Sequence, residues 1–150
     1  MMRIPVIGAL VLAAWAVLGA QRVEAEPPAM QVYKSATCGC CRKWVEHLRS
    51  RGYTVTVSDV QDLRPVKHEL GVPSGASSCH TAFVGGYFIE GHVPQEDISR
   101  LLAEHPDIAG LAVPGMPIGS PGMEGANPQA YSVFAVHKDG RITIFAEHRP

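Results

Sequence analysis

Apolar and polar positions alternate along the chain with two different periods, and these periods predict its secondary structure. Apolar residues spaced as i, i+3, i+4 and i+7 predict a helix over 42–51, whose buried face is Cys41, Trp44, Val45 and Leu48. Short runs of β-branched, aromatic and aliphatic residues predict strands, two of them joined by a Gly-Gly turn at 85–86. Together these patterns predict strands at 30–34, 53–58, 81–84 and 87–90, and further helices over 62–70 and from 94 to near 105.

The order of these elements predicts a single α/β domain over residues 26–150. Strand, helix, strand, helix, strand, strand and helix is the order of the thioredoxin or glutaredoxin plan. We therefore expect a thioredoxin-like fold in which a turn at 35–39 joins the first strand to the first helix, with Thr37 as the helix cap.

The last third of the chain departs from this plan. Residues 109–130 hold five Gly and four Pro, which predicts a long ordered loop or lid carrying Met116 and Met123. Two apolar runs at 131–137 and 141–148 flank an Asp-Gly turn and predict a C-terminal β-hairpin. The expected fold is thus a thioredoxin-like domain with an added Gly/Pro/Met-rich loop and a β-hairpin.

The N-terminal residues 1–25 differ in composition from the rest of the chain. They begin with a short basic stretch, continue with an apolar run over 4–20 and end in small residues before position 26. This pattern predicts a cleaved secretory signal peptide, and an uncleaved anchor is the alternative. We expect a periplasmic protein with no membrane contact after cleavage. The net charge of −1 and the absence of a basic run exclude an electrostatic case for nucleic-acid binding.

Three of the four cysteines lie within four residues, at Cys38, Cys40 and Cys41. A structural staple is disfavoured because a Cys38–Cys41 bridge would close almost no loop. At a helix N-terminus these thiols are activated as thiolates, and Cys38 and Cys41 have the C-x-x-C spacing of a redox dithiol. The third thiol, at Cys40, would scramble disulfide exchange but is useful for binding a soft metal.

The fourth cysteine is followed by a histidine, at Cys79 and His80, directly before a predicted strand. In the thioredoxin plan this position lies beside the helix N-terminus, so we expect all four cysteines to meet. Such donors suit Cu(I) and, less selectively, Zn(II), and four cysteines could equally hold one tetrahedral zinc ion. His80 is either a ligand or a hydrogen-bond partner that orients a thiolate.

Three other residues are weaker metal-ligand candidates. Thioethers suit Cu(I), but Met116 and Met123 also fit the common role of methionines that pack over a core. His92 is a candidate ligand or a helix cap, and the structural role is favoured.

Six short motifs resemble the CopG-type family of exported, thioredoxin-like metal-binding proteins, long catalogued as a domain of unknown function. The motifs are TCGCC at 37–41, GVP at 71–73, SCHT at 78–81, EGHVP at 90–94, GLAVPGMP at 110–117 and GSPGME at 119–124. The resemblance extends from about residue 30 to the C-terminus. It implies a periplasmic copper-resistance protein with a cysteine-bridged cluster of several copper ions that cycles copper between Cu(I) and Cu(II). It also implies that Cys38, Cys40, Cys41 and Cys79 are ligands.

Three functions follow as alternatives. The first is copper binding and redox handling, which would make the protein a copper oxidoreductase whose partner is a periplasmic copper efflux or chaperone protein. The second is a thioredoxin-like thiol-disulfide oxidoreductase that acts on proteins through Cys38 and Cys41. The third is a metallochaperone that transfers copper without redox chemistry.

Overall fold

The computed structural model of the protein describes residues 27–150. The predicted signal peptide, residues 1–25, lies outside the described residues. Within 27–150, no helix has the length and apolar character needed to cross a membrane.

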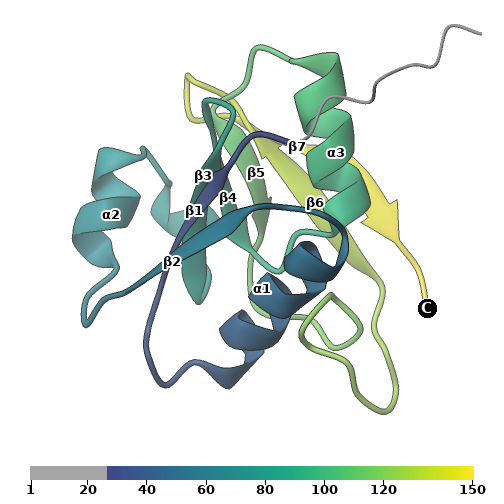
Figure 1. The fold of residues 1–150 in the computed structure, drawn as a ribbon. Helices are drawn as coiled ribbons and strands as arrows, with labels where there is room; N and C mark the ends of the chain where they lie inside the picture. The colour runs from purple at the N-terminus through teal and green to yellow at the C-terminus, as the bar shows by residue number, and fades with distance from the viewer. Residues whose placement is uncertain (1–26) are drawn as a thin grey trace, which may run out of the picture.

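A seven-stranded mixed sheet forms the centre of the molecule (Figure 1), with the strand order β2-β1-β3-β4-β5-β6-β7. The pairs β1/β2 and β4/β5 are parallel, and the other neighbours are antiparallel. The strands are β1 (Met30–Lys34), β2 (Val55–Asp59), β3 (His80–Val84), β4 (Tyr87–Gly91), β5 (Gly110–Val113), β6 (Tyr131–Val136) and β7 (Ile142–His148).

The helices follow the predicted order with shifted boundaries. They are α1 (Gly39–Ser50), α2 (Arg64–Glu69), the short 3-10 helix η1 (Ser74–Ala76) and α3 (Gln95–Glu104). Helix α1 begins at Gly39, three residues before the predicted start at 42. Its N-cap is Cys38 and not Thr37, because the Cys38 sulfur accepts a hydrogen bond from the Cys41 backbone N–H at 3.3 Å. The prediction that Thr37 caps this helix was therefore wrong.

Two hydrophobic cores lie on opposite faces of the sheet. Helices α1 and α3 cover one face, where Trp44, Leu48 and Ile98 pack on residues such as Ile89. The next residue back along β4, Phe88, belongs to a smaller core on the other face, under the segment that follows α2. Successive residues of a strand point to opposite faces, so each central strand serves both cores.

The predicted loop over 109–130 was wrong at its start, because Gly110–Val113 is strand β5. All four residues of β5 are buried, and the strand lies between β4 and β6. Gly110 is needed there, since a Cβ at this position would lie 2.2 Å from the carbonyl oxygen of Phe88. The rest of the segment, 114–130, is irregular, and the predicted hairpin after it is present as β6 and β7.

Strand directions place three chain segments at one end of the sheet. Strand β1 ends at Lys34 and leads into Cys38 and the start of α1. Strand β3 runs antiparallel to β1, and its first residue, His80, is the register partner of Lys34. Strand β4 returns beside β3 and ends at Gly91, directly before His92. The start of α1, the start of β3 and the end of β4 therefore meet.

Candidate metal centre

The N-terminus of α1 carries three sulfurs. Cys41 is buried, whereas Cys38 and Cys40 are half-buried. Cys38 and Cys41 form a disulfide with a Cα–Cα distance of 5.3 Å, and the Cys40 sulfur lies 3.6 Å from that of Cys38. This bridge is the oxidised form of the C-x-x-C dithiol identified in the sequence. Since it spans a sequence separation of 3, it removes little entropy from the unfolded chain.

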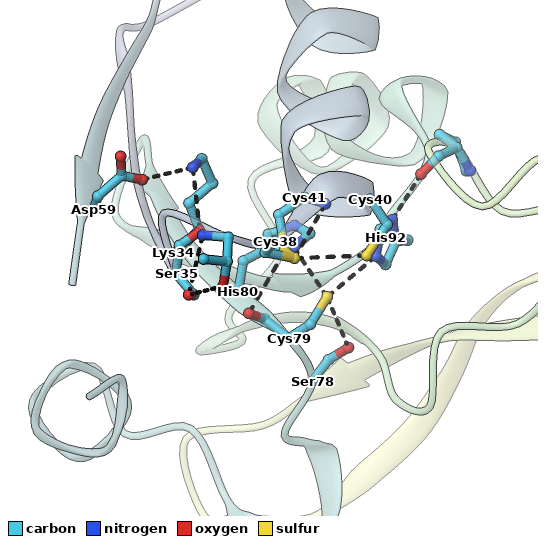
Figure 2. Close-up of a disulfide and its surroundings, with 12 residues drawn as sticks. Lys34, Ser35, Cys38, Cys40, Cys41, Asp59, Ser78, Cys79, His80 and His92 are labelled. Carbon is cyan, nitrogen blue, oxygen red and sulfur yellow. Dashed lines mark hydrogen bonds and ion pairs between the residues drawn. A yellow bond between two sulfur atoms is a disulfide. The ribbon is translucent and has the colours of Figure 1, made fainter. Parts of the chain in front are cut away.

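Cys79 completes a cluster of four sulfurs (Figure 2). The sulfurs of Cys38, Cys40, Cys41 and Cys79 all lie within 4.8 Å of one another. Sulfurs that share one tetrahedral ion at about 2.3 Å are roughly 3.8 Å apart, so four cysteines this close could converge on one ion once the Cys38–Cys41 bridge is reduced. The structure thus brings together the four cysteines that were expected to meet.

Two histidines lie on the other side of Cys79. The Cys79 sulfur is 3.3 Å from Nδ1 of His80 and 3.1 Å from Nε2 of His92, and both rings are fully buried. Cys79, His80 and His92 form a second group of donors within 4.8 Å of one another. The sulfur of Cys79 is therefore common to both groups.

His92 is the site residue that the sequence analysis assigned to structure. It does not cap α3: the N-cap is Pro94, and no side chain caps the helix. Instead, its Nδ1–H donates to the carbonyl oxygen of Pro121 at 2.8 Å. A carbonyl only accepts hydrogen bonds, so the proton is on Nδ1 and the lone pair of Nε2 points toward Cys79. The only sequence signal for this role was the position of His92 directly after a strand that runs beside Cys79-His80.

Burial favours the uncharged form of each of these three side chains. It raises the pKa of the Cys79 thiol to about 11, and the nearby Cys40 sulfur adds to this rise. It also holds the pKa of His80 well below its usual value, with a further contribution from His92, and lowers the pKa of His92 itself. A metal ion that binds here must displace the proton of Cys79, while each neutral imidazole keeps one ring nitrogen without a proton.

The two candidate methionines are in different surroundings. Met123 is half-buried and lines a surface hollow together with Cys40, Lys43 and Glu124. Met116 is 41% exposed and is absent from that lining. The structure therefore brings only Met123 close to the cysteine cluster.

Fold and site together define a mixed α/β protein with a cysteine–histidine cluster that could bind metal. A family model described as a protein of unknown function, DUF411, matches residues 76–123. Two solved structures of the copper resistance protein CopG, Form 2 and Form 1, match at 46% and 45% identity, each with a TM-score of 0.78. Each match covers 83% of this chain and 100% of the other. No curated protein sequence gave a significant match.

The chain therefore belongs to the DUF411 family and is a homologue of CopG.

Proposed function

We propose that this protein is a copper-binding protein of copper resistance, exported to the periplasm, that holds several Cu(I) ions on bridging thiolates. The observation that carries this proposal is the position of Cys79 between two donor groups. Five donors, three sulfurs and two imidazoles, surround this one sulfur and bring the set to six. A single tetrahedral ion uses four donors, so the set has room for more than one ion bridged by Cys79. The similarity to CopG points to copper as the metal.

The chemistry of the donors supports Cu(I) over harder cations. Thiolates and imidazoles select soft metals, and zinc is the alternative for a four-cysteine site. The ligands in this proposal are Cys38, Cys40, Cys41, Cys79, His80 and His92. Cysteines at the N-terminus of α1 beside the entrance to β3 also support descent from a thioredoxin-like fold.

A redox step between copper and the Cys38–Cys41 pair belongs to the same proposal. Closing the bridge converts two thiols into one disulfide and releases two electrons and two protons, which reduces two Cu(II) ions to two Cu(I) ions. Opening it again takes two electrons and two protons from two external thiols, which themselves become a disulfide. All four cysteines are available to Cu(I) only when this bridge is open.

The same bridge favours one alternative function. A C-x-x-C disulfide at a helix N-terminus is the arrangement of a thiol-disulfide oxidoreductase that acts on other proteins. Against this alternative, the Cys40 sulfur lies 3.6 Å from Cys38, where it would attack any mixed disulfide formed there.

The test is an anaerobic titration of the reduced protein with Cu(I), with metal counted per chain. We expect more than one copper per chain, and we expect Cys40→Ser and Cys79→Ser to lose most of it because each removes a shared donor. His92→Gln should weaken binding by about tenfold or more, in line with the loss of a metal-orienting or ligating group. His137→Gln is the matched control, since His137 bonds Thr143 in the hairpin, and it should bind copper normally.

Two outcomes would contradict the proposal. Failure of the reduced protein to bind Cu(I), with full disulfide-reductase activity retained in Cys40→Ser, would favour the oxidoreductase. Binding of a single Zn(II) ion with no more than one Cu(I) per chain would indicate a mononuclear site.

A further inference from the structure

Glu90 is a buried carboxylate that is not among the candidate copper ligands. Its side chain is 0% exposed, on the sheet face opposite α1. Three donors reach it: Lys67 of α2 forms an ion pair with it, the Ser78 backbone N–H donates at 2.5 Å, and the Thr81 hydroxyl donates at 2.7 Å. Lys67 also donates to the Thr81 hydroxyl oxygen at 2.9 Å. Several donors are what a buried carboxylate needs, because its desolvation is otherwise unfavourable.

These contacts join segments that are otherwise separate in the chain. Lys67 comes from α2, Ser78 from the connection after η1, and Thr81 from β3, whereas Glu90 lies on β4. The Ser78–Cys79 connection has no helix of its own, and its backbone N–H at Ser78 is held by the Glu90 carboxylate. Glu90 therefore fixes the peptide that leads directly into Cys79.

The residues after Glu90 hold the same connection from a second side. A Cβ at Gly91 would lie 2.6 Å from the Ser78 hydroxyl oxygen and 2.5 Å from the Val113 carbonyl oxygen, so the bare backbone of Gly91 packs against Ser78. His92 then contacts the Cys79 sulfur at 3.1 Å. The end of β4 thus holds Cys79 both through the backbone before it and through its thiol.

We propose that Glu90, with Lys67 and Thr81, is a positioning group that sets the distance between the Cys79 sulfur and the sulfurs of α1. This inference deepens the proposed function, because that distance decides whether Cys79 can share metal ions with Cys40. Glu90 touches no metal donor itself and acts through the Ser78–Cys79 backbone.

A second buried carboxylate, which pairs with a histidine elsewhere in the molecule, provides a control for stability alone. Asp97 at the start of α3 accepts a hydrogen bond from His148 of β7 at 2.6 Å, and its side chain is 7% exposed. Neither residue is among the donors of the cysteine–histidine cluster. Asp97→Asn should lower the melting temperature without changing the spacing of the sulfurs.

The experiment measures that spacing without copper. In a Cys38→Ser/Cys41→Ser background, Cys40 and Cys79 are the only two cysteines, and their disulfide equilibrates with a glutathione buffer of known ratio. The equilibrium constant gives the effective concentration of one thiol at the other. We expect Glu90→Gln to lower it by about tenfold or more, since a displacement of about 1 Å has effects of this size, and Asp97→Asn to leave it within about twofold of its parent. An unchanged constant in Glu90→Gln would overturn the inference.

A second pair of variants keeps the test available if Glu90→Gln does not fold. Thr81→Val removes the hydroxyl that bonds both Glu90 and Lys67, whereas Thr81→Ser keeps it. Thr81→Val should lower the effective concentration, whereas Thr81→Ser should keep the parent value. Equal values for the two variants would contradict the positioning role.

Copper titration of the four-cysteine protein then separates the two proposals. Loss of Cu(I) affinity in Glu90→Gln but not in Asp97→Asn supports both. If the parent protein binds no Cu(I) while the glutathione equilibrium still responds to Glu90, the proposed function fails and the positioning role stands. Full Cu(I) affinity in Glu90→Gln, with an unchanged glutathione equilibrium, overturns the positioning role alone.

Discussion

A single sulfur organises the candidate site at the scale of residues. Cys79 is close to the thiols of α1 on one side and to two imidazoles on the other, so its replacement affects two donor groups at once. Residue type alone does not assign such a role. The two loop methionines offer the same thioether, yet only Met123 lines the hollow that includes Cys40.

The methionines give a prediction at this scale. Met123→Leu keeps the side-chain volume and should cost less than about 1.5 kcal/mol in folding stability. We expect it to lower Cu(I) affinity, measured by competition with a chelator, by roughly tenfold, because it removes a soft donor beside Cys40. Met116→Leu is the matched control and should bind as the parent does. Equal affinities for the two variants would show that Met123 only packs.

The cysteines could be identified from sequence because their spacing is local, but the role of His92 could not. Three cysteines within four residues and a Cys-His pair before a strand are visible in the sequence. The proton position of His92, by contrast, depends on the Pro121 carbonyl, which lies 29 residues away and belongs to an irregular loop. No periodicity or motif predicts a carbonyl supplied by such a loop.

At the scale of elements, the irregular segment 114–130 is held against α1. Gly122 has a φ of +86°, and a Cβ there would lie 2.8 Å from both the Cys40 carbonyl oxygen and the Trp44 backbone nitrogen. The preceding residue, Pro121, supplies the carbonyl that orients His92. The close approach of backbone to backbone at Gly122 therefore fixes the loop beside the candidate metal site.

Gly122→Ala should disturb both stability and copper binding. The positive φ costs an alanine about 1–2 kcal/mol, and the contacts with α1 add about 1–3 kcal/mol of overpacking. Gly115→Ala is the matched control, because Gly115 has a φ of +83° but no atom within 4 Å of the added Cβ. Chemical denaturation should show a loss of about 3 kcal/mol for Gly122→Ala and about 1 kcal/mol for Gly115→Ala, and only the former should weaken Cu(I) binding. Similar losses of folding stability in the two variants would mean that the loop does not pack closely against α1 at Gly122.

The order of the elements was predictable from periodicity, whereas β5 was not. Helix α1 and the flanking strands have clear apolar patterns, so their existence and order were predicted and only their boundaries moved. Strand β5 is four residues long, starts with Gly110 and is followed directly by Pro114 and Gly115. It forms a strand because it is buried between β4 and β6. This is a tertiary effect, and the Gly- and Pro-rich composition of the segment does not reveal it.

At the scale of the whole molecule, buried neutral histidines make the stability of the fold depend on pH. The pKa of His80 lies well below its usual value and that of His92 is also lowered, in both cases chiefly because of burial. In the unfolded chain both histidines gain a proton below about pH 6.5. The unfolded state therefore binds more protons than the folded state in this range, and stability falls as the pH falls.

We expect the metal-free protein to lose stability as the pH is lowered from 7 through 6.5 toward 5. Each histidine adds a slope of up to about 1.4 kcal/mol per pH unit. Denaturant unfolding at a series of pH values measures this slope, and His80→Gln should reduce it. His105→Gln serves as the control, since His105 lies at the end of α3, outside the donor cluster, and it should leave the slope unchanged. A stability that is flat from pH 7 to 5 would contradict burial of neutral imidazoles.

The direction of β1 determines how the protein is oriented when it is fused or immobilised through the chain ahead of β1. The chain enters β1 at Met30, and Cys38 and α1 follow the opposite end of this strand. The described chain therefore begins at the end of the sheet away from the start of α1 (Figure 1). An anchor, surface or fused protein joined ahead of Pro27 would therefore leave the sulfur-bearing end facing outward. In that orientation the cysteine-bearing start of α1 points away from the point of attachment.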